Sequence, residues 1–291
     1  MMDRGYPRDM GMKDGDAQKT PFSPAERIGF GALALALALS LLDLQLSVLP
    51  LSAFLLLCFT APFLPGFSFF LPIISRGRSG AKAVALTFDD GPDPVSTPNL
   101  LDLLSRHSAV ATFFVTGKNA AAHPGIIEAI LSRGHTIGNH THGHDNFIML
   151  KSSKVLRSEI AATQQVLAHF GVIPLVFRPP VGVTSPRLAA VLRETGMVAV
   201  NFSRRARDRG NREVRGISQR ILCGLGAGDI LMLHDTRPHN AALYHRWLNE
   251  IDRVLYGIRE KGLAIIPLST LIDRPVMALV GEASHSRHSS G

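Results

Sequence analysis

The chain has few of the residues that form cross-links. Only two of its 291 residues are cysteine, Cys58 and Cys223. Cys58 falls in a long apolar run, so no disulfide is expected in the part of the chain that follows that run. The net charge of +8 raises the possibility of a nucleic-acid partner. The most basic segment, however, lacks interleaved aromatic residues and matches no nucleic-acid-binding motif, which argues against one.

The N-terminal quarter of the chain has long stretches without charge. Residues 1–27 are polar and predict a disordered tail, after which apolar runs cover residues 28–42 and 46–74. A helix needs about 20 residues to cross a bilayer, so residues 28–74 can supply two transmembrane helices. We therefore expect a membrane anchor, with a single span or a cleaved signal peptide as alternatives.

The turn between the two runs, around Asp43, has no positive charge. Arg27 precedes the first run, and Arg76, Arg78 and Lys82 follow the second. Positive residues favour the cytoplasmic side of a membrane. Two passes therefore predict an integral inner-membrane protein whose remaining domain faces the cytoplasm. The positive charge also suits contact with anionic membrane lipid.

Residues 82–271 alternate between strand-like and helix-like stretches. Strands are expected over residues 83–88, 110–115, 172–177, 197–202, 230–233 and 262–266, and helices over 124–133, 151–170, 186–194 and 241–261. This alternation predicts an α/β domain with a parallel sheet and crossover helices. It does not distinguish an open sheet from a barrel. Residues 276–291 predict a polar C-terminal tail.

Two adjacent carboxylates, Asp89 and Asp90, end the apolar run at residues 83–88 and precede Gly91 and Pro92. Neighbouring acids repel each other unless a cation or a strong donor shares the site. An Asp-Asp-Gly sequence on its own is commonly just a turn. The functional interpretation therefore depends on partners elsewhere in the chain.

A histidine cluster at His140, His142 and His144 supplies such partners. If the segment is helical, residues four apart share a face, so His140 and His144 could bind one divalent ion together. Imidazole favours zinc and its first-row neighbours, and an Asp oxygen would complete the set. We expect His142 to point away from the ion.

Two later segments also bring polar residues to the ends of apolar runs: Arg178-Pro179-Pro180-Val181-Gly182, and the strand that ends at His234. With Thr87-Phe88-Asp89-Asp90-Gly91 and the block from His140 to His144, they occur in the order of the polysaccharide deacetylase motifs. Over residues 82–271 the chain resembles this family, the NodB-homology domain or carbohydrate esterase family 4. The resemblance implies the family's distorted, incomplete (β/α) barrel.

The resemblance also implies a hydrolase that removes an N-acetyl group from an amino sugar with the help of a divalent metal. Asp90, His140 and His144 match the metal ligands, and the metal is expected to be zinc, with cobalt, manganese or nickel as alternatives. Asp89 matches the general base, and Arg178 the residue that orients it. His234 matches the general acid.

The match is incomplete around the acyl group. Pro180, Val181 and Gly182 correspond to the substrate-binding loop, whose backbone N–H near Val181 would hold the oxyanion, but Val181 replaces a common aromatic residue. Met232 stands where Leu is usual. The acid that tunes His234 is best matched by Asp208, although Arg209 follows it instead of the usual Trp. Formyl is therefore an alternative to acetyl.

Six arginines surround Asp208. Such a run can be a solvated loop. It can also form a cationic rim, in which Arg205 and Arg207 bind an anionic group, because arginine pairs with phosphate through two hydrogen bonds. The second interpretation favours a lipid-linked sugar phosphate as substrate.

Three functions follow from these patterns. The first is a membrane-anchored, metal-dependent N-deacetylase acting on an amino sugar in a glycan or lipid-linked sugar. The second is a deformylase of a lipid-linked amino-sugar phosphate. The third is a non-catalytic glycan-binding protein on the same fold. The six motif residues Asp89, Asp90, His140, His144, Arg178 and His234 argue against the third, because a binding protein needs neither a base nor an acid.

Overall fold

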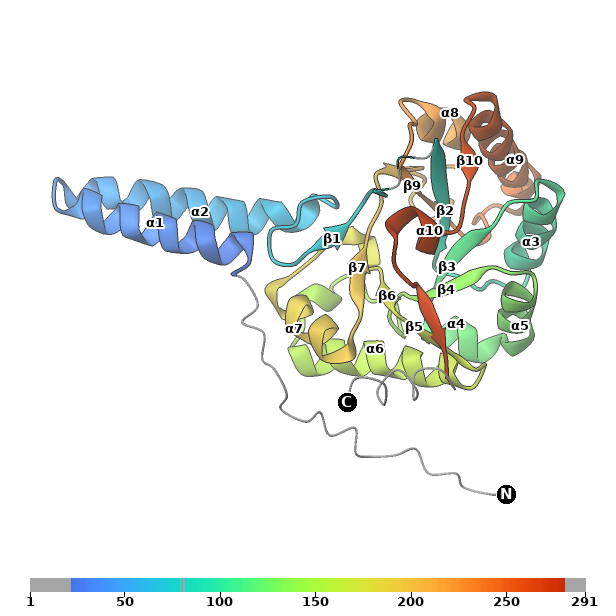
Figure 1. Cartoon of the computed structure of the whole chain (residues 1–291), viewed down its shortest axis with the longest axis horizontal. Coiled ribbons are helices and arrows are strands. Elements are labelled where there is room, and N and C mark those ends of the chain that lie inside the picture. The colour runs from blue at the N-terminus through green and yellow to red at the C-terminus, as the bar shows by residue number, and fades with distance from the viewer. Residues whose placement is uncertain (1–21, 79, 81, 281–291) are drawn as a thin grey trace, which may run out of the picture.

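The computed structural model of the chain describes residues 22–78, 80 and 82–280. The predicted disorder of the N-terminal tail up to residue 21, and of residues 284–291, lies outside the described residues. The remainder forms an α/β domain preceded by a helical hairpin (Figure 1).

One sheet of nine parallel strands carries the domain. Its order is β1-β7-β6-β4-β3-β2-β9-β8, and β10 also pairs with β2. The strands are β1 (Ile73–Ile74), β2 (Ala83–Asp89), β3 (Ala111–Val115), β4 (Thr136–Asn139), β6 (Val176–Phe177), β7 (Val198–Val200), β8 (Arg204–Arg205), β9 (Ile230–His234) and β10 (Ala264–Ile265). The sheet curls, but the strands at its two ends, β1 and β8, do not pair with each other, so within the described residues the barrel is not closed (Figure 1). The predicted α/β class with an incomplete barrel is confirmed.

Helices cover the outside of the curled sheet (Figure 1). They are α3 (Ser96–Arg106), α4 (Gly117–Ala122), α5 (Pro124–Ser132), α6 (Ser153–Ala168), α7 (Pro186–Thr195), α8 (Ile217–Leu222) and α9 (Tyr244–Glu260). The short helix α10 (Leu268–Ile272) instead packs on the inner side of the sheet. In α9, Trp247, Ile251, Val254 and Ile258 are buried. Their spacing of three or four residues places them on one face, and this face packs on the core.

Side-chain alternation decides which strand residues face the interior of the curled sheet. In β2, Phe88 packs in the main core with the outer helices, whereas Ala85 packs in a second, inner core. Successive side chains of a strand point to opposite faces, so Asp89 lies on the face of Ala85. In β9, Met232 belongs to the same inner core, and His234 follows it by two residues. Both strands thus direct a polar end residue to one face.

The predicted strand over residues 172–177 is divided between two sheets. β5 (Val172–Pro174) pairs antiparallel with β11 (Met277–Leu279), while β6 joins the main sheet. Pro174 has no N–H to continue the ladder. The predicted polar tail over residues 276–291 is therefore wrong at residues 277–279, which are apolar and form a strand.

The predicted anchor over residues 28–74 has different boundaries in the structure. Its first helix, α1 (Pro24–Ser40), begins earlier because Ser23 and Glu26 form a capping box. α2 (Val48–Thr60) is extended by the 3₁₀ turns Leu44–Ser47 and Ala61–Phe63. Pro62 and Pro65 follow, and proline ends helices. Phe69 still packs against Ala25 and Ala61 of the hairpin, whereas Leu71 is buried in a cluster of the domain and Ile73–Ile74 forms β1.

The helices α1 and α2 lie side by side and project from one edge of the domain (Figure 1). Within the described part of the chain, Leu44–Phe63 is the one helix that is long and apolar enough to cross a membrane. Many large apolar side chains of the hairpin are exposed, among them Leu33, Leu35, Leu37, Leu49, Leu55, Leu56 and Phe59. Such a surface is unusual for a helix pair in water.

Asp229 connects the segment after β1 to the sheet. Its buried carboxylate pairs with Arg76 at 2.9 Å and with Arg204 at 3.1 Å, and accepts a hydrogen bond from Ser203 at 2.8 Å. Two arginines from distant parts of the sequence thus share one acid.

Replacing Asp229 with alanine should lower the free energy of unfolding by roughly 2–3 kcal/mol, because it leaves partly buried donors without their acceptor. Thermal or denaturant unfolding of the full chain would measure the change. Glu260→Ala, at an exposed position, should change stability by less than about 0.5 kcal/mol. Equal stability of the two variants would show that the Asp229 contacts contribute nothing.

Candidate active site

The ends of β2 and β9 bring Asp89 and His234 together. The two residues are paired in the register of the parallel strands, and the backbone N–H of Asp235 donates to the carbonyl of Asp89 at 2.8 Å. Because both side chains lie on the inner face, they point toward the same space above the inner core. The structure thus unites two residues that are 145 positions apart in the chain.

Arg178 reaches this space from the opposite side of the curled sheet. Its Nη1 donates to Asp89 Oδ1 and to Thr87 Oγ1, both at 2.7 Å. Nε donates to the carbonyl of Val200 at 3.1 Å, and Nη2 to that of Asn201 at 3.0 Å. The guanidinium is wholly buried, so its charge is balanced by the Asp89 carboxylate and by these oxygen acceptors.

Asp90, His140 and His144 form a group that can hold a metal ion. One ligand atom from each residue lies within 4.8 Å of the others. Asp90 Oδ1 is 3.3 Å from His140 Nε2 and 3.0 Å from His144 Nε2. His140 Nδ1 lies 2.7 Å from the carbonyl of Arg178, which requires a proton on Nδ1 and makes Nε2, which faces Asp90, the atom that can bind a metal once it loses its proton. The sequence prediction that these three residues meet is confirmed.

The two histidines are not on a helical turn, contrary to expectation. His140 directly follows β4, and the segment that contains His144 is a loop. Thr141 and His144 have positive φ angles of 65° and 52°, which a helix does not allow. The loop is held by side chains instead: Asn139 Oδ1 accepts from the N–H of Thr141, and Glu159 Oε2 accepts from the N–H groups of His142 and Gly143.

Electrostatics within the group favour an ionised Asp90 beside a protonated His144 when no cation is bound. Burial alone would raise the pKa of Asp90, but His140 and His144 hold it well below its usual range. Burial alone would lower the pKa of His144, but Asp90 raises it above the usual value. A site that stabilises its carboxylate in this way also favours a divalent cation, which would replace the histidine protons.

Asp208 lies next to His234, as the sequence predicted. Asp208 Oδ1 is 2.7 Å from His234 Nδ1, and the acid is fully buried. Burial would lower the pKa of His234, but Asp208, together with Asp90 and Asp89, raises it to about 9. His234 is therefore protonated at neutral pH in the metal-free protein.

The arginines around Asp208 have different environments. Arg204, in β8, pairs with Asp229 and donates to the carbonyls of Cys223 and Gly224, so it supports the fold. Arg205 and Arg207 are exposed, and neither has an ion-pair partner among the described residues. Because Asp208 reaches His234, the loop that carries Arg207 borders the site.

The residues expected near the acyl group lie in two places. Pro180, Val181 and Gly182 form a short turn after Arg178, in which Val181 is exposed and has a φ of 52°. Met232 is nearly buried in the inner core, below His234. Val181 thus follows Arg178 by three positions, and Met232 lies on the same face of β9 as His234.

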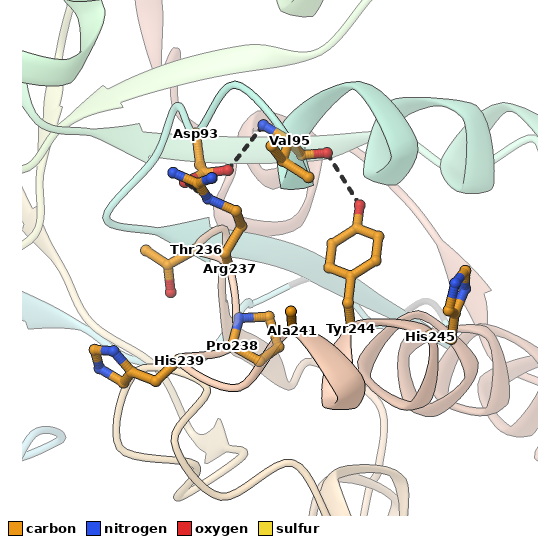
Figure 2. A pocket seen from close by; sticks show the side chains of 9 residues that line it. All are labelled: Asp93, Val95, Thr236, Arg237, Pro238, His239, Ala241, Tyr244 and His245. Atoms are coloured by element: carbon orange, nitrogen blue, oxygen red, sulfur yellow. Dashed lines mark hydrogen bonds and ion pairs between the residues drawn. The ribbon is translucent and has the colours of Figure 1, made fainter.

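A pocket of about 650 Å³ opens beside these strand ends (Figure 2). Asp93 and Val95 line one wall, and residues between Thr236 and His245 line the other. Arg237 Nε pairs with Asp93 at 3.0 Å, and the Tyr244 hydroxyl donates to the carbonyl of Val95 at 3.0 Å. The lining of the pocket follows β2 and β9 in the sequence and includes none of the residues Asp89, Asp90, His140, His144, Arg178 and His234.

Sequence reasoning missed the side chains that hold the motif loops. Asp235 is wholly buried and accepts hydrogen bonds from Ser96 at 3.0 Å and Thr97 at 2.7 Å, directly under Gly91. Burial raises its pKa to about 7, although the two hydroxyls oppose the shift. In the sequence, only its position directly after His234 could have indicated that Asp235 supports the site. Glu159, in the middle of α6, carried no signal at all.

Comparison with known proteins agrees with this geometry. Residues 76–200 match the polysaccharide deacetylase family. The chain is 32% identical over 193 residues to a peptidoglycan-N-acetylglucosamine deacetylase from Bacillus cereus, a match that covers 66% of this chain and 88% of that protein. This chain belongs to the polysaccharide deacetylase family. It is also 32% identical to a chitooligosaccharide deacetylase from Azorhizobium caulinodans, covering 67% of this chain and 96% of the relative.

Solved structures of the family show the same fold. The Bc1960 peptidoglycan N-acetylglucosamine deacetylase superimposes with a TM-score of 0.65 at 29% identity, covering 70% of this chain and 94% of that structure. Polysaccharide deacetylases of this kind are metal-dependent amide hydrolases that act on N-acetyl amino sugars, and the chain is an enzyme of that class. The group of Asp90, His140 and His144 fits the divalent metal that the family uses.

The ring pKa of His234 can be measured directly. In the metal-free protein, the NMR titration of its ring should give a pKa of about 9. Because this value exceeds the unfolded value of 6.5, the pairing should stabilise the fold fully below pH 6.5, and this stabilisation should be lost as pH rises through about 9. Asp208→Asn removes the nearest negative charge, so the pKa should fall toward 6.5.

Asp252→Asn is the matched control, because Asp252 pairs with His107 instead. It should leave the titration of His234 unchanged. An unaltered His234 pKa in Asp208→Asn would contradict the assigned electrostatic role of Asp208.

Proposed function

We propose that the protein is a membrane-anchored, metal-dependent hydrolase that removes an N-acetyl group from an amino sugar in a glycan or a lipid-linked sugar. The observation that carries this proposal is that the ends of β2 and β9 bring Asp89 and His234 side by side, next to the group of Asp90, His140 and His144. A base and an acid beside one metal site match the needs of amide hydrolysis. The names of the relatives, peptidoglycan and chitooligosaccharide deacetylases, support a glycan substrate.

Each residue would have one task. A divalent cation at Asp90, His140 and His144 would polarise the acyl carbonyl and lower the pKa of a water. Asp89, held by Arg178, would take the proton of the attacking water. The N–H of Val181 would donate to the oxygen that becomes negative in the transition state. His234, charged beside Asp208, would give its proton to the leaving amine nitrogen.

The donor set favours zinc as the metal. Two imidazoles and one carboxylate form a facial set that leaves positions open for water and substrate. Cobalt, manganese and nickel accept the same ligands, so metal analysis of the purified protein decides among them. A preparation with full activity and no bound divalent metal would disprove the assignment.

The acyl group is the variable part of the substrate. Val181 and Met232 would lie near the acyl group, and both differ from the residues common in the family. A formyl group is smaller than an acetyl group, so a deformylase of a lipid-linked amino-sugar phosphate is the second candidate. The exposed Arg205 and Arg207 favour it, because they can bind a phosphate. Assays that compare acetyl and formyl release from matched sugars distinguish the two.

The hairpin would anchor the enzyme in the bacterial inner membrane. α1 has 17 residues and Leu44–Phe63 has 20. At 1.5 Å per residue, Leu44–Phe63 matches the hydrocarbon thickness of about 30 Å, whereas α1, at about 26 Å, would cross it with local thinning of the bilayer. The turn at Asp43 would cross to the far side, while Arg27 and Arg76 remain in the cytoplasm with the catalytic domain.

The roles of Asp89 and His140 can be separated by measuring metal and turnover together. Asp89→Asn should retain the metal but lower kcat at least about 1,000-fold on an N-acetylated chitooligosaccharide, because the general base is lost. His140→Ala should lose both the metal and the activity. Metal loss in Asp89→Asn equal to that in His140→Ala would contradict the assigned roles.

The topology has an independent test. A reporter that is active only in the cytoplasm, fused after Gly291, should be active if the hairpin crosses twice. A reporter that is active only in the periplasm is the control and should be silent. The reverse result would exclude the two-pass arrangement.

A further inference from the structure

Six large apolar side chains are exposed where the hairpin meets the site. Phe63, Leu64 and Phe67 follow α2 and are 70%, 54% and 38% exposed. Phe147, Leu150 and Val181 lie on loops of the catalytic domain and are 70%, 77% and 54% exposed. We call these six residues the apolar rim. Exposed residues of this size, gathered in one place, commonly mark an interaction surface.

Direct contacts join the end of the hairpin to the loop of Val181. The N–H of Thr184 lies 3.4 Å from the carbonyl of Pro62. The Asn201 side-chain amide donates to the carbonyls of both Pro65 and Gly182, at 2.8 and 3.3 Å. The hairpin therefore ends on the loop that follows Arg178.

The loop of Phe147 and Leu150 lies against the same region. Ile148 and Met149 pack in one apolar cluster with Leu71 and Val183. Arg187 Nη1 lies 3.5 Å from the carbonyl of Leu150. The three segments that carry the apolar rim are thus continuous in space.

The apolar rim also borders the mouth of the site. Phe147 follows the metal-site residue His144 by three positions, and Val181 follows Arg178 by three. Both belong to loops at the strand ends, where Asp89 and His234 project. A surface that covers the apolar rim would therefore lie close to the reacting atoms.

Positive side chains flank the apolar rim. Lys151, Lys154 and Arg187 are exposed beside Leu150. Of these three, Lys151 pairs with Asp145, whereas Lys154 and Arg187 have no acid partner among the described residues. Apolar side chains with neighbouring cations match the boundary of a bilayer that contains anionic lipid.

We propose that the apolar rim inserts into the bilayer surface and holds the mouth of the active site against the headgroups. This inference rests on the proposed membrane hairpin and adds the orientation of the catalytic domain relative to the bilayer. The hairpin alone would leave the domain free to tilt, whereas a second contact at Phe147 and Leu150 would fix it. The substrate class that fits this orientation is a glycan carried on a membrane lipid, with its N-acyl sugar at headgroup depth.

Spin labels on the full chain can test the orientation in vesicles of phosphatidylethanolamine and phosphatidylglycerol. In a Cys58→Ala, Cys223→Ser background, single labels would be placed by Leu35→Cys in the hairpin, Leu150→Cys in the apolar rim and Tyr256→Cys on α9. Tyr256 is the matched control, because it is 59% exposed and lies on a helix away from the hairpin (Figure 1). Oxygen concentrates in the lipid, so a label in the bilayer collides mainly with oxygen. A nickel chelate stays in the water, so a label in water collides mainly with the chelate.

Labels at positions 35 and 150 should both favour oxygen, while the label at 256 favours the nickel chelate. A lipid-facing label at 35 with a water-facing label at 150 would overturn the proposed insertion of the apolar rim and leave the proposed anchor intact. Water exposure at 35 would overturn the anchor and the inference with it. Protection of 150 from both reagents would show that protein covers the surface, which would also overturn the inference.

Activity gives a second test. The double change Phe147→Ser and Leu150→Ser should lower kcat/KM about tenfold on an N-acetylglucosaminyl lipid in these vesicles, and leave turnover of a soluble chitooligosaccharide within twofold. Tyr256→Ser should affect neither substrate. An unchanged rate on the vesicle-borne substrate, or equal losses on both substrates, would overturn the inference.

Discussion

The buried ion pair between Arg178 and Asp89 is the interaction on which the site depends. Arg178 extends from the end of β6, and its donors reach Asp89 and Thr87 on β2 and the carbonyls of Val200 and Asn201. These bonds cross the interior of the curled sheet, so they hold its two sides together. The carbonyl of the same residue also accepts a hydrogen bond from His140 Nδ1. One arginine therefore orients both the proposed base and a proposed metal ligand.

The two adjacent carboxylates have separate environments because they lie on different kinds of backbone. Asp89 is the last residue of β2 and takes the inner face of the strand, where Arg178 meets it. Asp90 has a φ of 74°, which turns its side chain out of the strand and toward His140 and His144. A change of backbone direction between neighbours thus separates a proposed proton acceptor from a proposed metal ligand and limits their mutual repulsion.

The hairpin gives this chain a constraint that the catalytic fold does not need. It ends on the loop after Arg178, through Pro62 and Pro65. The site and the proposed anchor therefore share a structural element, and a substrate would be presented from the direction of the membrane. With the hairpin in a membrane as proposed, this arrangement would suit a lipid-borne glycan.

The amino-acid sequence by itself determined the strand ends and the residues that carry the chemistry. Two short apolar runs predicted strands that end at Asp89 and His234, and side-chain alternation fixes on which face of its own strand each residue lies. The order of the motifs then indicated the family and its incomplete barrel. The sequence also indicated Asp208, whose acid lies beside His234 as expected.

Only the tertiary structure decided how the loops hold those residues. His140 and His144 meet through positive φ angles and through Asn139 and Glu159, not through a helical turn. Residues 73–74 and 277–279 looked like anchor and tail, but they pair as strands β1 and β11 of the domain. The physical reason is the same in each case. Loop conformation and strand pairing depend on partners far away in the chain, and local pattern does not encode those partners.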